Sequence, residues 1–393
     1  MTRILVAFSD TGGGHRAAAI AIRDALCTLS DNVNVRMVDP YALSQRWPFD
    51  RLARAYPHVV DNAAWLWRGG FRLTNSRLCS NAAQSLAWPA LRRTFQALRD
   101  RETPDVVVST HPLLTNPLRR AFRDVPLAVV VTDLVSGHAS WYQRSVQLLT
   151  VPTDAARIKA IAHGVPVACT ADLGLPIASS FVHRDGERHR LTEQLGWSHE
   201  RPTIVLMGGG DGVGPLETLA HAIDEACLPC DLAIVTGRNA ALASRLEQRT
   251  WRNTVHTYGF VNNLGAMLRA AATVLTKAGP GSICEAFAAG CPLVLYAAIP
   301  GQESGNVQLV CESGAGVWAP SASAVTNALR AWFVGTSAES MRMQAARAAL
   351  AAARPTAATD IAQRILALAS GAEARPRPSR DARRLALSPL PQH

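Results

Sequence analysis

The chain has 393 residues and a net charge of +10 with a pI of about 9.7; 48% of its residues are hydrophobic and 18% are charged. This composition excludes an intrinsically disordered protein, and the length suffices for two domains with separate cores. The basic excess favours anionic partners, namely nucleic acid, nucleotides or an anionic membrane surface. No apolar run approaches the roughly 20 residues that a membrane-spanning helix needs, so we expect no transmembrane segment.

The first predicted unit is a strand, a glycine turn and a helix. Residues 3–8 form an apolar run, three glycines follow at 12–14, and an apolar-faced helix then extends to about residue 29. His15 stands at the start of this helix, next to whatever occupies the glycine turn. The positive helix end favours a neutral imidazole, which a general base requires. The alternative is a helix-start histidine that bonds only to backbone.

Residues 41–100 differ in composition from the rest of the first half. They contain nine arginines and three aspartates, with tryptophans at 47, 65, 67 and 88. Tryptophan beside arginine and aliphatic residues is typical of a membrane headgroup region. We therefore interpret this segment as a membrane-facing insertion, the alternative being a helical insertion with a buried tryptophan core.

Three further strands are predicted at residues 105–109, 127–131 and 146–151. The loops after them carry Thr110-His111-Pro112, Thr132-Asp133, His138 and Trp141. The carboxyl ends of parallel strands meet at one edge of a sheet, so these side chains should share a face with His15. A second acid or base is expected among them, and the sequence does not rank Asp133 above His138.

A second unit of the same kind begins at residue 202. The segment 176–201 is polar and irregular, and it is followed by a strand, the glycine turn at 208–210 and a helix. We predict an α/β fold of two Rossmann-like doubly wound domains with a cleft between them. The expected bounds are 1–175, a linker at 176–201, 202–370, and a disordered basic tail at 371–393.

The stretch from Val274 to Asn306 carries the clearest ligand signal. A strand ends in a turn in which Gly279 and Gly281 allow close approach to the backbone, and a helix follows at once, which favours an anion such as a phosphate. Glu285, one turn into the helix, suits a ribose diol, and the adjacent Gln302 and Glu303 suit further hydroxyls. Together these features indicate a nucleotide sugar.

Eight cysteines are scattered over the chain, and only Cys227 and Cys230 form a CxxC pair. Without a second pair or nearby histidines, we expect reduced thiols in a cytoplasmic protein and no metal site. The chain also lacks an Asp-x-Asp motif, so no visible ligand set requires a divalent cation.

The motifs SDTGGGHRAAA, TDLVSGHASWY, GGGDGVGPLETL, VTGRNAALASRL, YGFVNNLGAML, TKAGPGSICEAFAAGCPLVL and GQESGN occur in this order. From residue 3 to about 318 the chain resembles the monogalactosyldiacylglycerol synthases and the related bacterial processive diacylglycerol glycosyltransferases, which belong to glycosyltransferase family 28 and have the glycosyltransferase-B fold. The resemblance implies an inverting transfer of galactose or glucose from a UDP-sugar to the sn-3 hydroxyl of 1,2-diacylglycerol, which gives a β-glycosyl lipid, in one step or processively.

The resemblance also implies residue roles. His15 corresponds to the catalytic base, Glu285 to the ribose-binding carboxylate, and Gln302 with Glu303 to the hexose-binding pair. Asp133, His138 and Trp141 fall in the acceptor region, where Ala139 replaces the usual proline. The remaining UDP-sugar contacts would be Gly14, Gly208, Gly209, Gly210, Gly237, Arg238, Phe260, Val261, Lys277, Gly279, Gly281 and Ser282.

The partners implied are a UDP-hexose, diacylglycerol and anionic membrane lipids, with no nucleic acid, metal or other cofactor. We expect a peripheral protein on the cytoplasmic side of the cell membrane. Two alternatives stay open: transfer to another lipid acceptor, of the peptidoglycan lipid-intermediate type, and a UDP-sugar 2-epimerase of the same fold.

Overall fold

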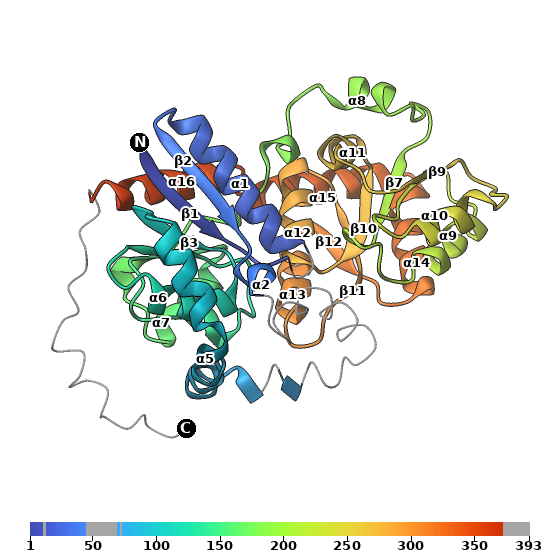
Figure 1. Cartoon of the computed structure of the whole chain (residues 1–393). Helices are drawn as coiled ribbons and strands as arrows, with labels where there is room; N and C mark the ends of the chain where they lie inside the picture. Colours follow the sequence, from blue (N-terminus) through green and yellow to red (C-terminus); the bar gives the residue numbers. More distant parts are fainter. Residues whose placement is uncertain (11–12, 45–68, 71–72, 372–393) are drawn as a thin grey trace.

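The computed structural model describes residues 1–10, 13–44, 69–70 and 73–371 (Figure 1). Two six-stranded sheets form its two halves, and the strand pairs within both are parallel. The strands of the first sheet are β1 (Thr2–Ala7), β2 (Val33–Val38), β3 (Val106–Ser109), β4 (Leu127–Val130), β5 (Leu148–Val151) and β6 (Thr170–Asp172). Those of the second are β7 (Thr203–Met207), β8 (Asp231–Val235), β9 (Val255–Tyr258), β10 (Thr273–Lys277), β11 (Leu293–Ala297) and β12 (Gly316–Trp318).

Helices cover both sheets. In the first half they are α1 (Gly14–Leu29), α2 (Pro40–Leu43), α5 (Arg77–Arg101), α6 (Thr115–Ala121) and α7 (Asp154–Ala162), and α8 (Arg188–Gln194) follows in the connecting segment. In the second half they are α9 (Leu216–Glu225), α10 (Ala240–Glu247), α11 (Leu264–Ala270), α12 (Pro280–Ala289), α13 (Ser304–Glu312), α14 (Ala322–Phe333) and α15 (Ala338–Ala352), and α16 (Ala357–Ala369) ends the described chain. Short 3-10 helices include η2 (Pro112–Leu114), η3 (Ala139–Trp141) and η5 (Ser179–Phe181).

The central strands are apolar on both faces, and this dictates the layered architecture. All four residues of β3, of β4 and of β5 are buried, as are all five of β7 and β8. A strand buried on both sides needs helices on both faces, which is the doubly wound arrangement of parallel sheets. The predicted fold class, two Rossmann-like α/β units, is therefore confirmed.

The strand orders determine which loops lie together at the carboxyl ends of the strands. They are β2-β1-β3-β4-β5-β6 and β12-β11-β10-β7-β8-β9. In the first sheet β2 and β3 lie on opposite sides of β1, and in the second sheet β8 and β10 lie on opposite sides of β7. Such a reversal of strand order creates a crevice at the carboxyl ends of the central strands. The loops after β1, β3 and β4 therefore lie at one edge, and those after β7, β10 and β11 at the corresponding edge of the second sheet.

The last helix crosses between the halves. The sequence assigns 202–370 to the second unit, whereas α16 packs against α1 and the first sheet, with Ile361, Ile365 and Leu368 in one core cluster with Ile4 and Val6 (Figure 1). Residues 323–369 are rich in alanine, and the chain breaks twice within them, at 334–337 and 353–356, to form α14, α15 and α16. The strands β6 and β12 were not predicted, because each has only three residues.

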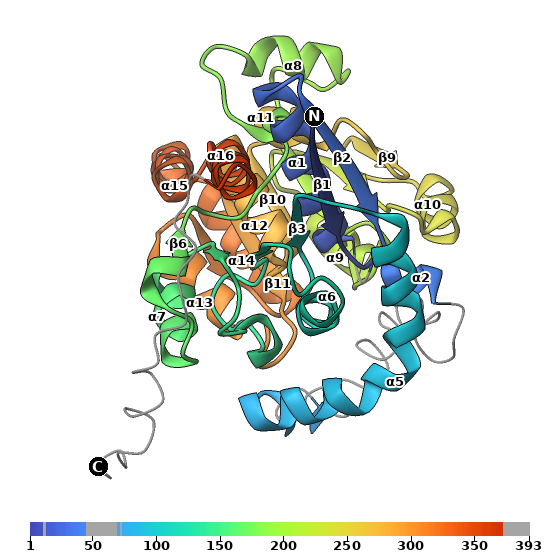
Figure 2. The same cartoon turned by 60° about the vertical axis from the view of Figure 1, so that its left-hand side comes forward.

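Helix α5 projects from the first half and bends part-way along, with Pro89 inside it (Figure 2). Much of the predicted insertion, including Trp47, Trp65 and Trp67, lies outside the described residues, as does nearly all of the predicted tail. Trp88 packs against the core of the first half, as the alternative of a buried tryptophan requires. In the part of the chain that the structure describes, no helix combines the length and apolarity needed to cross a bilayer.

Candidate active site

His15 is fixed at the start of α1 by groups from two other loops. The residue before the helix, Gly13, has φ of 79°, which turns the chain sharply from β1 into α1. The Nδ1 atom of His15 lies 2.8 Å from the carbonyl oxygen of Thr110 and 2.9 Å from Oγ1 of Thr132. A carbonyl oxygen can only accept, so Nδ1 carries the ring proton and Nε2 is left as the accepting atom of the neutral imidazole. Thr110 also donates its hydroxyl to the backbone oxygen of His15, at 3.1 Å.

The surroundings keep His15 neutral at physiological pH. Its pKa is lowered from the ordinary value of 6.5, mainly by burial, while the charge of Asp133 and the bond to the Thr110 carbonyl oppose the change. The ring of His111 packs edge-on against His15 with centroids 4.5 Å apart, and burial, together with repulsion from His15, holds the pKa of His111 well below its usual value. A neutral imidazole with a free Nε2 can accept a proton, which is what a general base does.

The predicted acceptor residues separate into two groups. Asp133 and Trp141 are both buried, and Nε1 of Trp141 donates to Oδ2 of Asp133 at 2.7 Å. The Trp141 ring lies 6.0 Å from that of His15. His138 caps η3 instead: its Nδ1 lies 2.7 Å from Oγ of Ser140, and its Nε2 lies 3.1 Å from Oγ1 of Thr74. Asp133 and Trp141 thus belong to the surroundings of His15, whereas His138 ties η3 to the chain before α5.

The glycine turn between β10 and α12 has the shape expected of an anion-binding site. Gly279 precedes the helix, Pro280 occupies its first position, and Gly281 and Ser282 follow half-buried in the first turn. The N–H groups of a first helical turn have no partner within the helix, and the helix dipole makes this end positive. Lys277 ends β10 beside the same turn.

Three polar side chains surround this turn. Glu285 is half-buried one turn into α12, and burial raises its pKa to about 7. Glu303 is buried, its Oε2 accepts from the Ile299 N–H at 2.8 Å, and burial raises its pKa against the opposing effects of that N–H and Lys277. The Oε1 atom of Gln302 is buried and has no hydrogen-bond partner among the described residues. Each therefore offers polar atoms that a hydroxyl-rich ligand would satisfy.

The glycine turns after β7 and β8 pack closely against each other. A Cβ atom on Gly237, which has φ of 58°, would lie 2.3 Å from the carbonyl oxygen of Gly210, so the turn after β8 must approach the turn after β7 without a side chain. Gly208 is buried in the same loop, whereas Gly209 is exposed with φ of 79°. The Arg238 N–H donates to the Gly210 carbonyl at 2.9 Å. These turns form a rigid edge beside the α12 turn.

Three further residues predicted to contact the UDP-sugar, Arg238, Phe260 and Val261, follow β8 and β9. The guanidinium of Arg238 lies over the ring of Phe260 at 5.3 Å and bonds to Asp211 at 2.8 Å. Phe260 is 58% exposed, whereas Val261 packs against the core of the second half.

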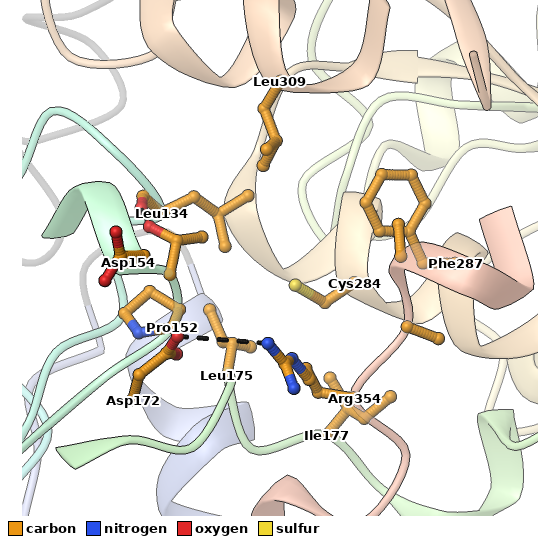
Figure 3. Close-up of a pocket in the computed structure, with 13 residues that line it drawn as sticks. Leu134, Pro152, Asp154, Asp172, Leu175, Ile177, Cys284, Phe287, Leu309 and Arg354 are labelled. Atoms are coloured by element: carbon orange, nitrogen blue, oxygen red, sulfur yellow. Dashed lines mark hydrogen bonds and ion pairs between the residues drawn. The ribbon is translucent and has the colours of Figure 1, made fainter. Parts of the chain in front are cut away.

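The two halves meet where these groups converge. Helix α1 contacts α12, and the charge of Asp133 acts both on His15 and on Glu303 of the second half. Gly14 is exposed at the start of α1, with open space where a Cβ atom would lie. A cavity of about 250 Å³ continues between the halves; its wall includes Leu134, which follows Asp133, and Cys284, which precedes Glu285 (Figure 3). Arg354 and Asp172 also line this cavity, and the two side chains lie 3.9 Å apart across the two halves.

One structurally important residue of this site was missed from the sequence. Asn306 is buried, and its Nδ2 donates to the carbonyl of Ala278 at 2.9 Å, just before the glycine turn. The sequence feature that could have identified it is its position at the end of the GQESGN motif. Among the described residues, no group of three or more His, Cys, Asp or Glu side chains could hold a metal ion.

The chain matches two family models. Residues 15–177 match the model for monogalactosyldiacylglycerol (MGDG) synthase, and residues 203–361 match the glycosyltransferase family 28 C-terminal domain. The monogalactosyldiacylglycerol synthase of Spinacia oleracea, a chloroplastic protein, is 33% identical over 371 residues, which cover 90% of this chain and 70% of the spinach protein.

Solved structures show the same fold at low identity. MurG of Acinetobacter baumannii superposes with a TM-score of 0.58 at 14% identity, over 93% of this chain and 99% of that one. The UDP-GlcNAc 2-epimerase of Neisseria meningitidis bound to UDP-GlcNAc has a TM-score of 0.58 at 10% identity, over 93% of this chain and 100% of the epimerase. These likenesses support the fold alone.

Proposed function

This chain belongs to the monogalactosyldiacylglycerol synthase family, and we propose that it transfers galactose or glucose from a UDP-sugar to the sn-3 hydroxyl of 1,2-diacylglycerol with inversion at the anomeric carbon. The observation that carries the proposal is the meeting of the two halves at α1 and α12. The first half contributes a neutral imidazole with an accepting Nε2, and the second contributes a glycine turn at a helix start with a carboxyl group one turn further on.

The chemistry follows from these positions. The hydroxyl of the acceptor gives its proton to Nε2 of His15 while its oxygen attacks the anomeric carbon from the face opposite the diphosphate. The bond from that carbon to the phosphate oxygen breaks, UDP leaves with the electron pair, and the new glycosidic bond is β. General-base catalysis of this kind contributes on the order of 10²–10⁴-fold. The free N–H groups and positive end of α12 would stabilise the charge that develops on the diphosphate.

The donor would extend along the second half. We assign the diphosphate to the turn at Gly279–Ser282 with Lys277, the ribose diol to Glu285, and the hexose hydroxyls to Gln302 and Glu303. The uracil would lie near Phe260 and Val261, with Arg238 and the glycines at 208–210 and 237 beside the diphosphate. The sequence has no Asp-x-Asp motif that would position a divalent cation, so we propose a metal-independent reaction.

The acceptor is a lipid, so the protein must reach a bilayer surface. Helix α5 supports this, because Leu78 and Leu86 are 84% and 83% exposed on its projecting part, and Arg92 and Arg93 are exposed further along. Exposed leucines with nearby cations favour insertion at an anionic interface, with about 1 kcal/mol for each cation near the surface. We propose peripheral binding at the cytoplasmic face of a membrane, with anionic lipids as partners.

The test is to incubate the protein with diacylglycerol vesicles and UDP-galactose or UDP-glucose in turn, and to identify the glycolipids and their anomeric configuration. Hexosyl diacylglycerol in the β form is the expected product, and it should form equally in the presence of a metal chelator. His15→Ala should abolish transfer while UDP affinity stays within about twofold. Interconversion of a UDP-sugar without lipid would instead favour the epimerase, and transfer only to a polyprenyl acceptor would favour the peptidoglycan lipid-intermediate type of transferase.

A further inference from the structure

Asp133 carries a carboxylate and is the sequence neighbour of Thr132, one of the two residues that contact Nδ1 of His15. It follows Thr132, whose Oγ1 lies 2.9 Å from Nδ1 of His15, in the loop directly after β4. It is 6% exposed, and the indole of Trp141 donates to its Oδ2 at 2.7 Å. Because the Trp141 ring also lies 6.0 Å from the ring of His15, the buried carboxylate and indole and the half-buried imidazole form one cluster.

The contacts within this cluster define what each group does. The Nδ1–H of His15 is directed to the Thr110 carbonyl and the Thr132 hydroxyl, and both are uncharged. Within the described part of the chain the imidazole therefore has no carboxylate directly bonded to it, although the proposed reaction converts it to an imidazolium. A buried cation without a counter-charge is costly, since the interior solvates it poorly. The nearby negative charge must come from elsewhere in the cluster.

We propose that Asp133, anchored by the indole of Trp141, is the counter-charge that stabilises His15 when the histidine accepts the proton of the acceptor hydroxyl. The inference rests on the proposed function for its catalytic meaning. Asp133 is a positioning residue here, because it acts through His15 and not on the substrate. The structure thereby distinguishes it from His138, which is bonded to Ser140 and Thr74.

Other titratable groups also face the two partners. His111 faces His15 and is held neutral by burial. Tyr142, Lys159 and Glu303 interact electrostatically with Asp133. Tyr142 is neutral over the working range, because burial raises its pKa further above the ordinary value of 10. The charge on Asp133 raises the pKa of His15 against the larger effect of burial, so removing it should lower that pKa further.

Asp133→Asn tests this with little change of shape, since the amide oxygen can still accept from the indole of Trp141. We expect kcat to fall at least about tenfold, as for loss of a preorganised charge, while KM for the UDP-sugar stays within twofold. The acid limb of the pH–kcat profile should move to lower pH. Trp141→Phe, which keeps the charge and removes its anchor, should reduce kcat with a smaller movement of the acid limb. Asp124→Asn, at an exposed carboxylate with a side chain 87% exposed, is the matched control for charge.

A second readout does not depend on turnover. The His15 ring can be titrated by NMR in histidine-labelled protein and assigned by the loss of its signal in His15→Gln. Asp133→Asn should lower the pKa of His15, and Asp124→Asn should leave it unchanged. An unchanged His15 pKa and pH profile in Asp133→Asn would overturn the inference. If the wild-type protein transferred no hexose although the NMR shift occurred, the pairing of the two residues would be supported and only the proposed reaction would fail.

Discussion

Gly305 lies so close to Val135 that a Cβ atom on the glycine would stand 2.7 Å from Cγ1 of the valine. Gly305 is in the first turn of α13, two residues after Glu303, and Val135 is two residues after Asp133. The contact therefore joins the loop beside His15 to the loop that carries the predicted hexose-binding pair. It sets how closely the two halves of the site approach each other.

Gly305→Ala should separate the two halves. The added methyl group cannot fit at 2.7 Å, so the loops must move apart by a fraction of an ångström to about 1 Å, and misplacement on this scale costs up to about 10²-fold in rate. We expect kcat/KM to fall by at least about tenfold. UDP affinity, measured by calorimetry, should change little because its proposed contacts, apart from Gly14, lie in the second half.

Gln308→Ala is the control for this change, because Gln308 is exposed on the same helix. A Gly305→Ala protein with unchanged kcat/KM would mean that this contact does not fix the catalytic distance.

Glu285 should make stability depend on pH in a direction unusual for a glutamate. Burial raises its pKa from 4.5 to about 7 in the folded protein, so the folded state disfavours the ionised form. The resulting penalty is absent below about pH 4.5, grows between pH 4.5 and about 7, and is constant at higher pH. Glu285→Gln should therefore stabilise the ligand-free protein by up to about 3 kcal/mol at pH 8, with no gain near pH 4.5.

The same variant should bind UDP about tenfold more weakly, because the carboxylate that we assign to the ribose diol is lost. Thermal unfolding at the two pH values and calorimetry with UDP measure the two effects. Stabilisation without any loss of UDP affinity would leave Glu285 as a buried group with no ligand role.

Most of the fold follows from local patterns. The apolar runs of β1, β3, β4 and β7 are continuous, and the glycine turns after β1, β7 and β10 mark where strands give way to helices, so the two Rossmann-like units were predictable. The surroundings of His15 were also partly predictable, since Thr110 and Thr132 follow adjacent strands of a parallel sheet.

What could not be predicted depends on contacts between distant segments. The packing of α16 on the first sheet arises from Ile361 and Ile365, whose spacing fits a helix in either half. Asp133 and His138 could not be ranked from the sequence, because they differ in which one bonds to the indole of Trp141, and residue spacing does not encode that contact. The raised pKa of Glu285 likewise depends on burial by residues remote in the chain.

The exposed leucines of α5 should be needed for membrane binding. Leu78 and Leu86 are eight residues apart in α5, which places them about two turns apart on the same side of the helix. Leu78→Glu with Leu86→Glu places two negative charges on this face, so we expect binding to vesicles with anionic lipid to fall at least about tenfold, with little change in Tm. Cosedimentation with vesicles measures the binding.

Met343→Glu, at an exposed residue of α15 in the second half, is the control and should bind as the wild type does. Equal binding of the double variant and the wild type would exclude α5 as the membrane-contacting element. Wild-type binding to purely zwitterionic vesicles as strong as to anionic ones would exclude the electrostatic contribution.

Asn306 should hold the glycine turn that precedes α12. It is 1% exposed, and its Nδ2 donates to the Ala278 carbonyl at 2.9 Å. Asn306→Asp keeps the shape and replaces the donor by a buried carboxylate that faces a carbonyl oxygen. The repulsion and the desolvation should cost about 2–4 kcal/mol of stability at pH 8 and weaken UDP binding, because the turn loses its anchor.

The pH dependence of the Asn306→Asp effect identifies its cause. Burial should raise the pKa of the introduced carboxyl group, and its protonated form can donate to the Ala278 carbonyl as the amide did. The stability deficit relative to the wild type should therefore shrink as the pH falls below that raised pKa and remain full above it. Asn262→Asp, at an exposed position of the same half, should show no deficit at either pH. A deficit that stayed constant between pH 5 and pH 8 would point to altered packing and not to the lost hydrogen bond.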